Sequence, residues 1–267
     1  MRHTVHFALV SILAVAATAG LSSCSTSPEG RRQLIILPDS QMDTMGVQAF
    51  TEMKSKTPVD SNATTNAYVK CVANAITDAL SEKRAWEVVV FKDEEANAFA
   101  LPGGKIGVQT GLLKVATNAD QLAAVIGHEV GHVLARHGNE RASEQLGTQA
   151  LAGGVGALFG DPNSTKYKVA MGALGVGAQY GVLLPHSRTQ ESEADTIGLE
   201  LMAKAGFNPA EAVQLWRNMD RLSAGGAPPE FMSTHPSNER RIADLQAKQG
   251  QAVAIFKASG RHPNCRP

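Results

Sequence analysis

The segment at residues 126–138, IGHEVGHVLARHG, places two histidines and a glutamate on an otherwise apolar helical pattern. A helix advances by about 100° per residue, so His128 and His132 project from adjacent turns of one face. Two imidazoles at this spacing suit one Zn²⁺, and Glu129 beside them is placed to act as a general base on a water. The pattern predicts a buried helix over residues 118–136 that holds one zinc ion per chain.

A catalytic zinc needs a third protein ligand and an open coordination position. The best candidates are Glu191 and Asp195, four residues apart on a helix predicted over residues 188–205. They share one helical face, so one carboxylate can bind the metal while the other accepts a hydrogen bond from a ligand histidine. The spacing alone leaves open which carboxylate takes which role.

Two polar residues near these motifs are predicted to lie outside the metal site. His137 is nine residues past His128, on the far side of a helix that Gly138 is expected to end, so we expect a surface or capping residue. Glu193 projects away from the face of the two candidate carboxylates, and a solvated position is expected for it.

The remaining pattern predicts an α+β fold that is mostly helical. β-Branched and aromatic residues indicate short strands at residues 86–91, 97–100 and 105–109, which we expect to form a small meander. Apolar spacing and capping residues indicate further helices over residues 41–54, 61–80, 209–222 and 238–248. We therefore predict a single domain over residues 41–267, with a sheet of three or four strands packed beside the helix of His128 and His132.

The N-terminal residues 1–23 are predicted to be a lipoprotein signal peptide. A positive start at Arg2 precedes an apolar run that is too short to span a bilayer comfortably. The tetrapeptide Leu21-Ser22-Ser23-Cys24 resembles a lipobox, which predicts that Cys24 is lipidated and anchors the chain in a lipid bilayer. Residues 24–40 are then expected to be a tether without packing. The alternative is an ordinary signal peptide with an incidental cysteine.

Net charge, cysteine content and one apolar segment limit the possible partners and cross-links of the chain. Without the signal peptide the formal charge is about −1, which gives no electrostatic case for nucleic acid. Cys71 and Cys265 form a disulfide if they lie close together, and the alternative of two free thiols stays open. The apolar, glycine-rich run at residues 169–184 favours close helix packing over membrane contact.

Four motifs in a fixed order make the chain resemble a known family. They are His128-Glu129-x-x-His132, Glu191-x-x-x-Asp195, Asn97-Ala98-Phe99-Ala100-x-Pro102-Gly103-Gly104, and Ser233-Thr234-His235-Pro236 followed by Arg241-Ile242. Together they resemble the gluzincin metallopeptidases related to the CAAX prenyl protease and HtpX, and within them the periplasmic BepA-like and LoiP-like lipoproteins. The resemblance covers roughly residues 41–248.

The resemblance implies a zincin-type fold and a role for several residues. Glu191 is then the third zinc ligand, and Asp195 is the carboxylate that orients a ligand histidine. Residues Asn97, Ala98, Phe99 and Ala100 are expected to form an edge strand to which a substrate peptide adds as a further strand.

The resemblance also places His235 opposite the metal on a loop, where two roles are open. It either donates a hydrogen bond to the oxyanion of the reaction or occupies the fourth metal position at rest. We favour the donor role, because Glu129 needs a water on the metal and a fourth protein ligand would displace it.

The function implied by the resemblance is that of a zinc metalloendopeptidase. We expect it to hydrolyse internal peptide bonds of unfolded or misassembled envelope proteins, as a quality-control enzyme. The resemblance of the N-terminus to bacterial lipoproteins further implies an anchor at the periplasmic face of the outer membrane, because Ser25 and not an aspartate follows Cys24. The alternative is a latent or inactive peptidase fold that acts as a periplasmic chaperone or peptide-binding module, and the retention of Glu129 favours the enzyme.

Overall fold

The computed structural model describes residues 24–151, 187–224, 230–235 and 239–267. The predicted signal peptide and the apolar run at residues 169–184 lie outside these residues. The helices are α2 (Asp39–Lys56), α3 (Ala63–Asp78), α4 (Ala119–Leu134), α5 (His137–Leu151), α7 (Arg188–Ala205), α8 (Ala210–Ala224), α9 (Glu230–Thr234) and α10 (Glu239–Ser259), with a 3₁₀ turn at Thr110–Lys114. The strands are β1 (Cys24–Thr26), β2 (Arg32–Leu34), β3 (Glu87–Phe91), β4 (Ala98–Leu101) and β5 (Lys105–Gln109).

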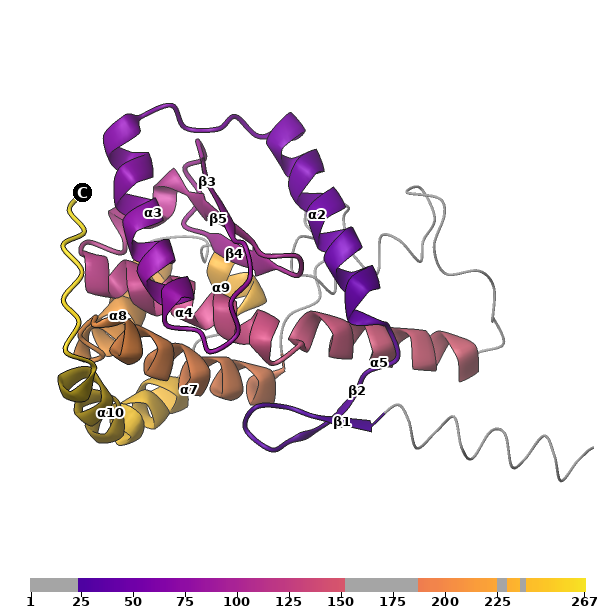
Figure 1. Cartoon of the computed structure of the whole chain (residues 1–267). Helices are drawn as coiled ribbons and strands as arrows, with labels where there is room; N and C mark the ends of the chain where they lie inside the picture. The colour runs from indigo at the N-terminus through magenta and orange to yellow at the C-terminus, as the bar shows by residue number, and fades with distance from the viewer. Residues whose placement is uncertain (1–23, 152–186, 225–229, 236–238) are drawn as a thin grey trace, which may run out of the picture.

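The small sheet lies beside α4, which confirms the predicted α+β fold class. In Figure 1, α2 and α3 lie on either side of the sheet, and α4 runs between the sheet and the layer formed by α7 and α10. The core of this arrangement includes Leu122 and Ile126, which are fully buried on α4. The histidine-bearing helix is therefore enclosed by packed elements on several sides.

The strand order is β3-β5-β4, so the predicted meander is wrong. A meander would place β4 in the centre, but β5 pairs in parallel with β3 and antiparallel with β4. The tight turn between β4 and β5 depends on Gly103 and Gly104, which have φ of 79° and 70° and would be strained with any other residue. Among the described strands β4 pairs only with β5, which makes it an edge strand, as expected.

Helices α4 and α7 pack closely because glycines meet at their crossing. A Cβ atom on Gly198 of α7 would lie 2.7 Å from the backbone nitrogen of His128, and one on Gly131 of α4 would lie 2.9 Å from the carbonyl oxygen of Ala194. Neither distance is compatible with a side chain. The small residues thus bring the two motif-bearing helices into backbone contact.

The predicted helix ends are largely confirmed. The Asn118 side chain accepts a hydrogen bond from the backbone of Gln121 and caps α4, Ser187 and Gln190 form a capping box on α7, and Gly206 ends α7 with φ of 92°. Two ends differ from the prediction: α10 continues to Ser259, past the expected end at residue 248, and α4 ends early. The helix stops at Leu134 because Arg136 adopts φ of 57°, and Gly138 lies inside α5.

Residues 24–34 form a packed hairpin, so the expectation of an unpacked tether is wrong for this segment. Cys24 pairs with Leu34 at the open end of β1 and β2. The buried side chain of Gln33 donates to the carbonyl oxygen of Ala135 at 2.6 Å, and Arg31 forms ion pairs with α5 and α7. These buried polar contacts hold the hairpin against the corner between α4 and α5.

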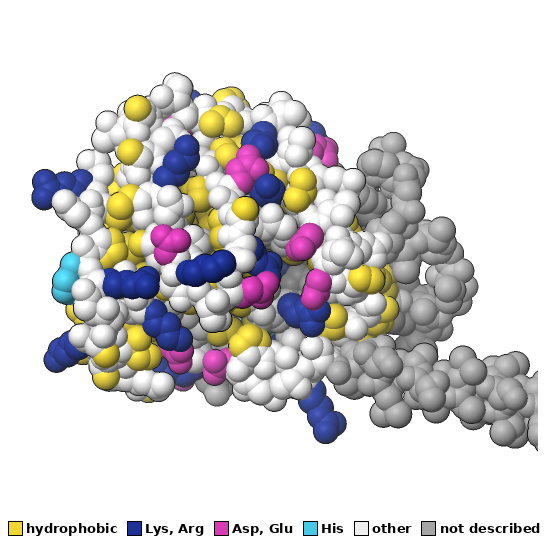
Figure 2. All heavy atoms as spheres, in the orientation of Figure 1, with side chains coloured by type: hydrophobic (Ala, Val, Ile, Leu, Met, Phe, Trp, Pro, Cys, Tyr) yellow, Lys and Arg dark blue, Asp and Glu magenta, His cyan; other side chains and the backbone are white. Residues whose placement is uncertain are grey.

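The C-terminal tail is fixed to α3. Cys71 and Cys265 are joined by a disulfide with an S–S distance of 1.98 Å. On the face shown in Figure 2, basic and acidic side chains are interspersed, in keeping with a formal charge of zero for the whole sequence. Within the described part of the chain, no helix combines the length and the apolar composition that crossing a membrane requires.

Candidate metal centre and active-site cavity

The two histidines of α4 converge on one point. The Nε2 atoms of His128 and His132 lie 3.0 Å apart, and both side chains are buried. Burial lowers the pKa of His132 well below its usual range. His132 is therefore a neutral imidazole, which is the form that binds a metal.

Two further donors come from α7 and from the end of α9. Glu191 places Oε1 3.4 Å from Nε2 of His132 and Oε2 3.5 Å from Nε2 of His128. His235 places Nδ1 3.0 Å from Oε1 of Glu191 and 3.3 Å from Nε2 of His128. One ligand atom from each of these four residues lies within 4.8 Å of all the others. Three imidazoles and one carboxylate fit a tetrahedral divalent metal of the zinc type.

Glu129 lies beside these donors. Its Oε1 atom is buried, accepts no hydrogen bond from the residues that the structure describes, and lies 3.5 Å from Nε2 of His235. Burial raises the pKa of this carboxyl group. A carboxylate with an unused oxygen and a raised pKa is suited to take a proton from a water and to release it again.

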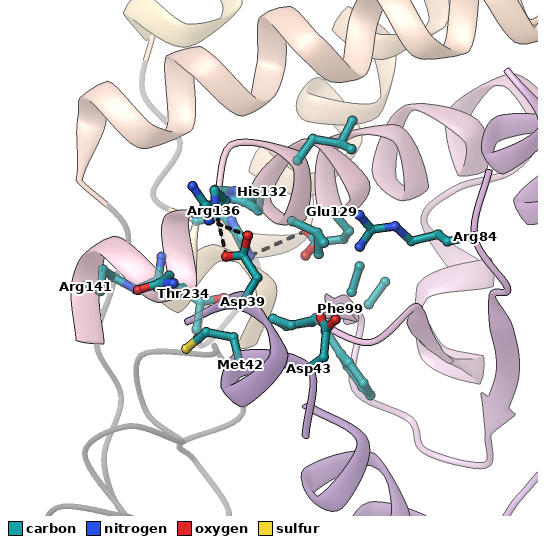
Figure 3. Close-up of a pocket in the computed structure, with 18 of the residues that line it drawn as sticks. Asp39, Met42, Asp43, Arg84, Phe99, Glu129, His132, Arg136, Arg141 and Thr234 are labelled. Atoms are coloured by element: carbon teal, nitrogen blue, oxygen red, sulfur yellow. Dashed lines mark hydrogen bonds and ion pairs between the residues drawn. The ribbon is translucent and has the colours of Figure 1, made fainter. Parts of the chain in front are cut away.

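A cavity of about 240 Å³ opens onto these groups. Glu129 and His132 line it from α4, residues 97–100 line it from β4 and the position before it, and α2 lines another side. Figure 3 shows Glu129 and Phe99 near its centre, with Met42 and Asp43 of α2 below. The edge strand, Glu129 and the metal donors His132 and His235 therefore face one shared space.

Asp195 orients His128. Its Oδ1 atom lies 2.9 Å from Nδ1 of His128, on the ring side opposite to the donor atom Nε2. Burial and the nearby Arg241 lower the pKa of His128, but the hydrogen bonds that its ring donates to Asp195 and Glu191 outweigh both and raise this pKa to about 9. A metal at Nε2 takes the place of the proton directed at Glu191. Fixing Nδ1–H in this way leaves Nε2 directed at the other donors.

Arg241 of α10 completes this side of the centre. Its guanidinium donates to Asp195 at 2.7 and 2.8 Å, pairs with Oε2 of Glu191 at 2.6 Å and lies 3.6 Å from the ring centre of Trp216. No role for Arg241 was predicted from the sequence, although this residue lies in one of the four motifs. A buried arginine beside two carboxylates keeps both of them ionised.

The predictions for His137 and Glu193 are wrong. His137 is fully buried, its Nδ1 lies 2.8 Å from Nδ1 of His132, and its Nε2 lies 3.0 Å from Oε2 of Glu193. Burial lowers the pKa of His137 to about 4, so it is neutral. The reason is the early end of α4, because the backbone turn at Arg136 redirects His137 toward the site. Glu193 is buried because Arg31 of the hairpin covers and neutralises it.

These groups define a metallopeptidase site. They are a histidine pair one helical turn apart, a carboxylate from a second helix, and a glutamate that faces a cavity beside an edge strand. The comparison with known families agrees. The chain belongs to peptidase family M48, which matches residues 62–249. The predicted family is thereby confirmed.

Curated relatives include metalloendopeptidases. The chain is 37% identical over 162 residues to mitochondrial metalloendopeptidase OMA1 of Schizosaccharomyces pombe, covering 60% of this chain and 46% of the relative. It is 34% identical over 212 residues to the Saccharomyces cerevisiae OMA1, covering 73% and 57%. It is 29% identical over 259 residues to the β-barrel assembly-enhancing protease of Escherichia coli, covering 91% and 52%. The chain thus spans about half the length of these relatives.

The relatives correct the predicted location. Both yeast relatives are named as mitochondrial, and both are more similar in sequence to this chain than the bacterial protease is. The prediction of the periplasmic face of an outer membrane, which rested on Ser25 after Cys24 and on the resemblance to periplasmic members, is therefore wrong. Lipidation of Cys24 is a separate prediction, and it is not tested by these names.

Proposed function

We propose that this protein is a zinc-dependent metalloendopeptidase. The observation that carries the proposal is the position of Glu129, which has an unused oxygen and lines the same cavity as the metal donors His132 and His235 and the edge strand β4. A structural metal site has no need of such a carboxylate. We assign the metal ligands to His128, His132 and Glu191, with His235 as the fourth donor in the present arrangement.

The reaction follows from the placement of these side chains. When bound there, zinc supplies a Lewis acid that polarises a water and the carbonyl of the scissile bond. Glu129 accepts the proton of the attacking water and passes it to the departing amine, and its raised pKa favours both steps. Asp195 and Arg241 hold His128 in one orientation during the reaction.

The substrate is proposed to bind as an added strand along β4. Backbone pairing with Ala98 and Ala100 would read the extended shape of a peptide more than its sequence. Such a groove suits unfolded or misassembled proteins, and we propose these as substrates in a quality-control role. Anchoring by a lipid on Cys24 would place the domain at a membrane surface, and no particular membrane follows from it.

A protease assay on an unfolded protein tests the proposal. We expect cleavage at internal bonds that stops when a chelator is added and returns when Zn²⁺ is restored in excess. The Glu129→Gln variant should bind zinc and fail to cleave. Failure of the parent protein to cleave any unfolded substrate, while it still binds one and suppresses its aggregation, would instead support the alternative of a latent peptide-binding module.

A further inference from the structure

His132 is held by a series of polar contacts that starts at the partly buried Arg31 of the N-terminal hairpin and continues through the buried Glu193 and His137. Nδ1 of His132 lies 2.8 Å from Nδ1 of His137, and Nε2 of His137 lies 3.0 Å from Oε2 of Glu193. The same carboxylate oxygen accepts a hydrogen bond from Nε of Arg31 at 3.0 Å. We propose that His137 and Glu193 are positioning residues for the metal ligand His132, and that Arg31 couples the hairpin to this pair. The inference rests on the metal site of the proposed function.

One arrangement of protons satisfies this series of hydrogen bonds when His132 binds a metal. Nε2 of His132 points toward the other metal donors, so its lone pair must be free and its proton must be on Nδ1. That proton is donated to Nδ1 of His137, which must then carry its own proton on Nε2. Nε2–H of His137 donates to Glu193, which is an acceptor only. Glu193 therefore fixes the tautomer of His137, and His137 in turn fixes the tautomer of His132.

The opposite side of the centre has the same construction. Asp195 fixes Nδ1 of His128 and is itself held by Arg241. Glu193 lies two residues before Asp195 on α7, reaches the second ligand through His137, and is held by Arg31. Each of the two ligand histidines on α4 is thus held by a carboxylate of α7, directly for His128 and through His137 for His132, and each carboxylate is paired with an arginine from another element. The two sides differ in that one arginine comes from α10 and the other from the hairpin.

Arg31 and Gln33 both fix the hairpin to the corner between α4 and α5. The guanidinium also pairs with Glu140 of α5, and Gln33 donates to Ala135 at the corner where α4 ends. This corner directly precedes His137. The position of His137 therefore depends on the docking of the hairpin as well as on Glu193.

Zinc affinity measured by chelator competition on the full purified chain tests the proposal. Loss of an outer partner of a metal ligand typically costs about tenfold to a hundredfold in affinity. We expect that loss for His137→Phe, which keeps an aromatic ring of somewhat larger size and removes both hydrogen bonds, and a loss of about three- to tenfold for Arg31→Met. Glu200→Gln, on the same helix but in an exposed pair with Lys204, is the matched control and should bind zinc like the parent.

A spectroscopic readout separates positioning from general destabilisation. Co²⁺ in place of zinc should give altered visible absorption bands in His137→Phe and parent-like bands in Glu200→Gln, because the ligand geometry changes only in the former. Arg31→Lys should restore most of the affinity lost in Arg31→Met. If His137→Phe does not fold, the two Arg31 variants carry the test. Parent-like affinity and spectra in the variants would overturn this inference alone, whereas a parent that binds no metal would overturn the proposed function and this inference with it.

Discussion

Arg241 holds Asp195 through two hydrogen bonds of 2.7 and 2.8 Å, and Asp195 in turn lies 2.9 Å from Nδ1 of His128. All three side chains are buried. A helix near the C-terminus thus fixes the orientation of a metal ligand on α4, through a carboxylate on α7. The geometry makes the pair a part of the metal site and a buried ion pair of the core at the same time.

Asp195→Asn is expected to weaken both properties. Zinc affinity should fall by about tenfold to a hundredfold, because the amide holds the ring of His128 less firmly than the carboxylate does. The free energy of unfolding should fall by roughly 3 kcal/mol, because Arg241 loses a buried partner charge. Chelator competition and urea denaturation measure the two effects. If zinc affinity and unfolding free energy both equal those of the parent, Asp195 supports neither metal binding nor stability.

Glu129→Gln is expected to separate metal binding from catalysis. The variant keeps the four donor residues, so zinc content should stay near one ion per chain, while turnover should fall at least a hundredfold because the base is removed. Metal analysis and a peptidase assay on the same sample provide the check. Activity within tenfold of the parent would contradict the role of Glu129.

Gly198→Ala is expected to disturb the metal site through helix packing. The added Cβ would lie 2.7 Å from the backbone nitrogen of His128, so α4 and α7 must move apart. Overpacking of this kind costs about 1–3 kcal/mol, and the movement separates His128 from Glu191, so zinc affinity should fall too. Gly250→Ala in α10 is the control, since its Cβ would have no neighbour within 4 Å and should stabilise the helix by about 0.5–1 kcal/mol. Equal effects of the two changes would refute the packing argument.

Local signals explain how much of the fold could be predicted. The cap at Asn118, the box of Ser187 and Gln190, and the end at Gly206 each depend on residues within one turn of the helix. The spacing of His128 and His132 is likewise a property of one helix. Such features can be read from the sequence because no distant part of the chain has to supply a partner.

The features that escaped prediction depend on distant partners. Arg136 takes a positive φ, which is uncommon for a residue other than glycine, and its side chain bonds to Asp39 and Ser25 from much earlier in the chain. That corner decides where His137 points. The helical position of Glu193 predicts a solvated side chain, and the sequence gives no sign that Arg31 covers it. The strand order was missed for the same reason. It depends on the pairing of β5 with the distant strand β3, which leaves β4 at the edge of the sheet.

The hairpin is expected to loosen in acid. Burial raises the pKa of Glu140, but hydrogen bonds from Arg31 and Gln190 outweigh burial and hold this pKa below its usual value. A group with a lowered pKa contributes its full stability above the usual value and loses it as the pH falls through the lowered one. The difference in unfolding free energy between the parent and Glu140→Gln should therefore be constant from pH 7 to about pH 5 and shrink below that. A difference that does not change with pH would exclude ionised Glu140 as the hairpin's partner.

His235 lies among the metal donors in this structure, and its position changes the expectation for its removal. Nδ1 is within 3.0 Å of Glu191 and 3.3 Å of His128, so together with His132 it completes four protein donors. A catalytic zinc needs one position open for water, and four protein ligands fill a tetrahedral site. On this geometry we propose that His235 blocks the metal at rest, in place of the oxyanion-donor role predicted from the sequence.

His235→Ala is accordingly expected to keep its zinc on the three remaining ligands and to cleave an unfolded protein faster than the parent does. Water then reaches the metal without displacing an imidazole, and Glu129 finds the water it needs. Ser233→Ala, an exposed change on the short helix α9 that directly precedes His235, is the control and should leave the rate unchanged. The measurement is turnover per zinc-loaded chain. A loss of roughly a hundredfold with zinc retained would mean instead that His235 stabilises the oxyanion and leaves the metal when substrate binds.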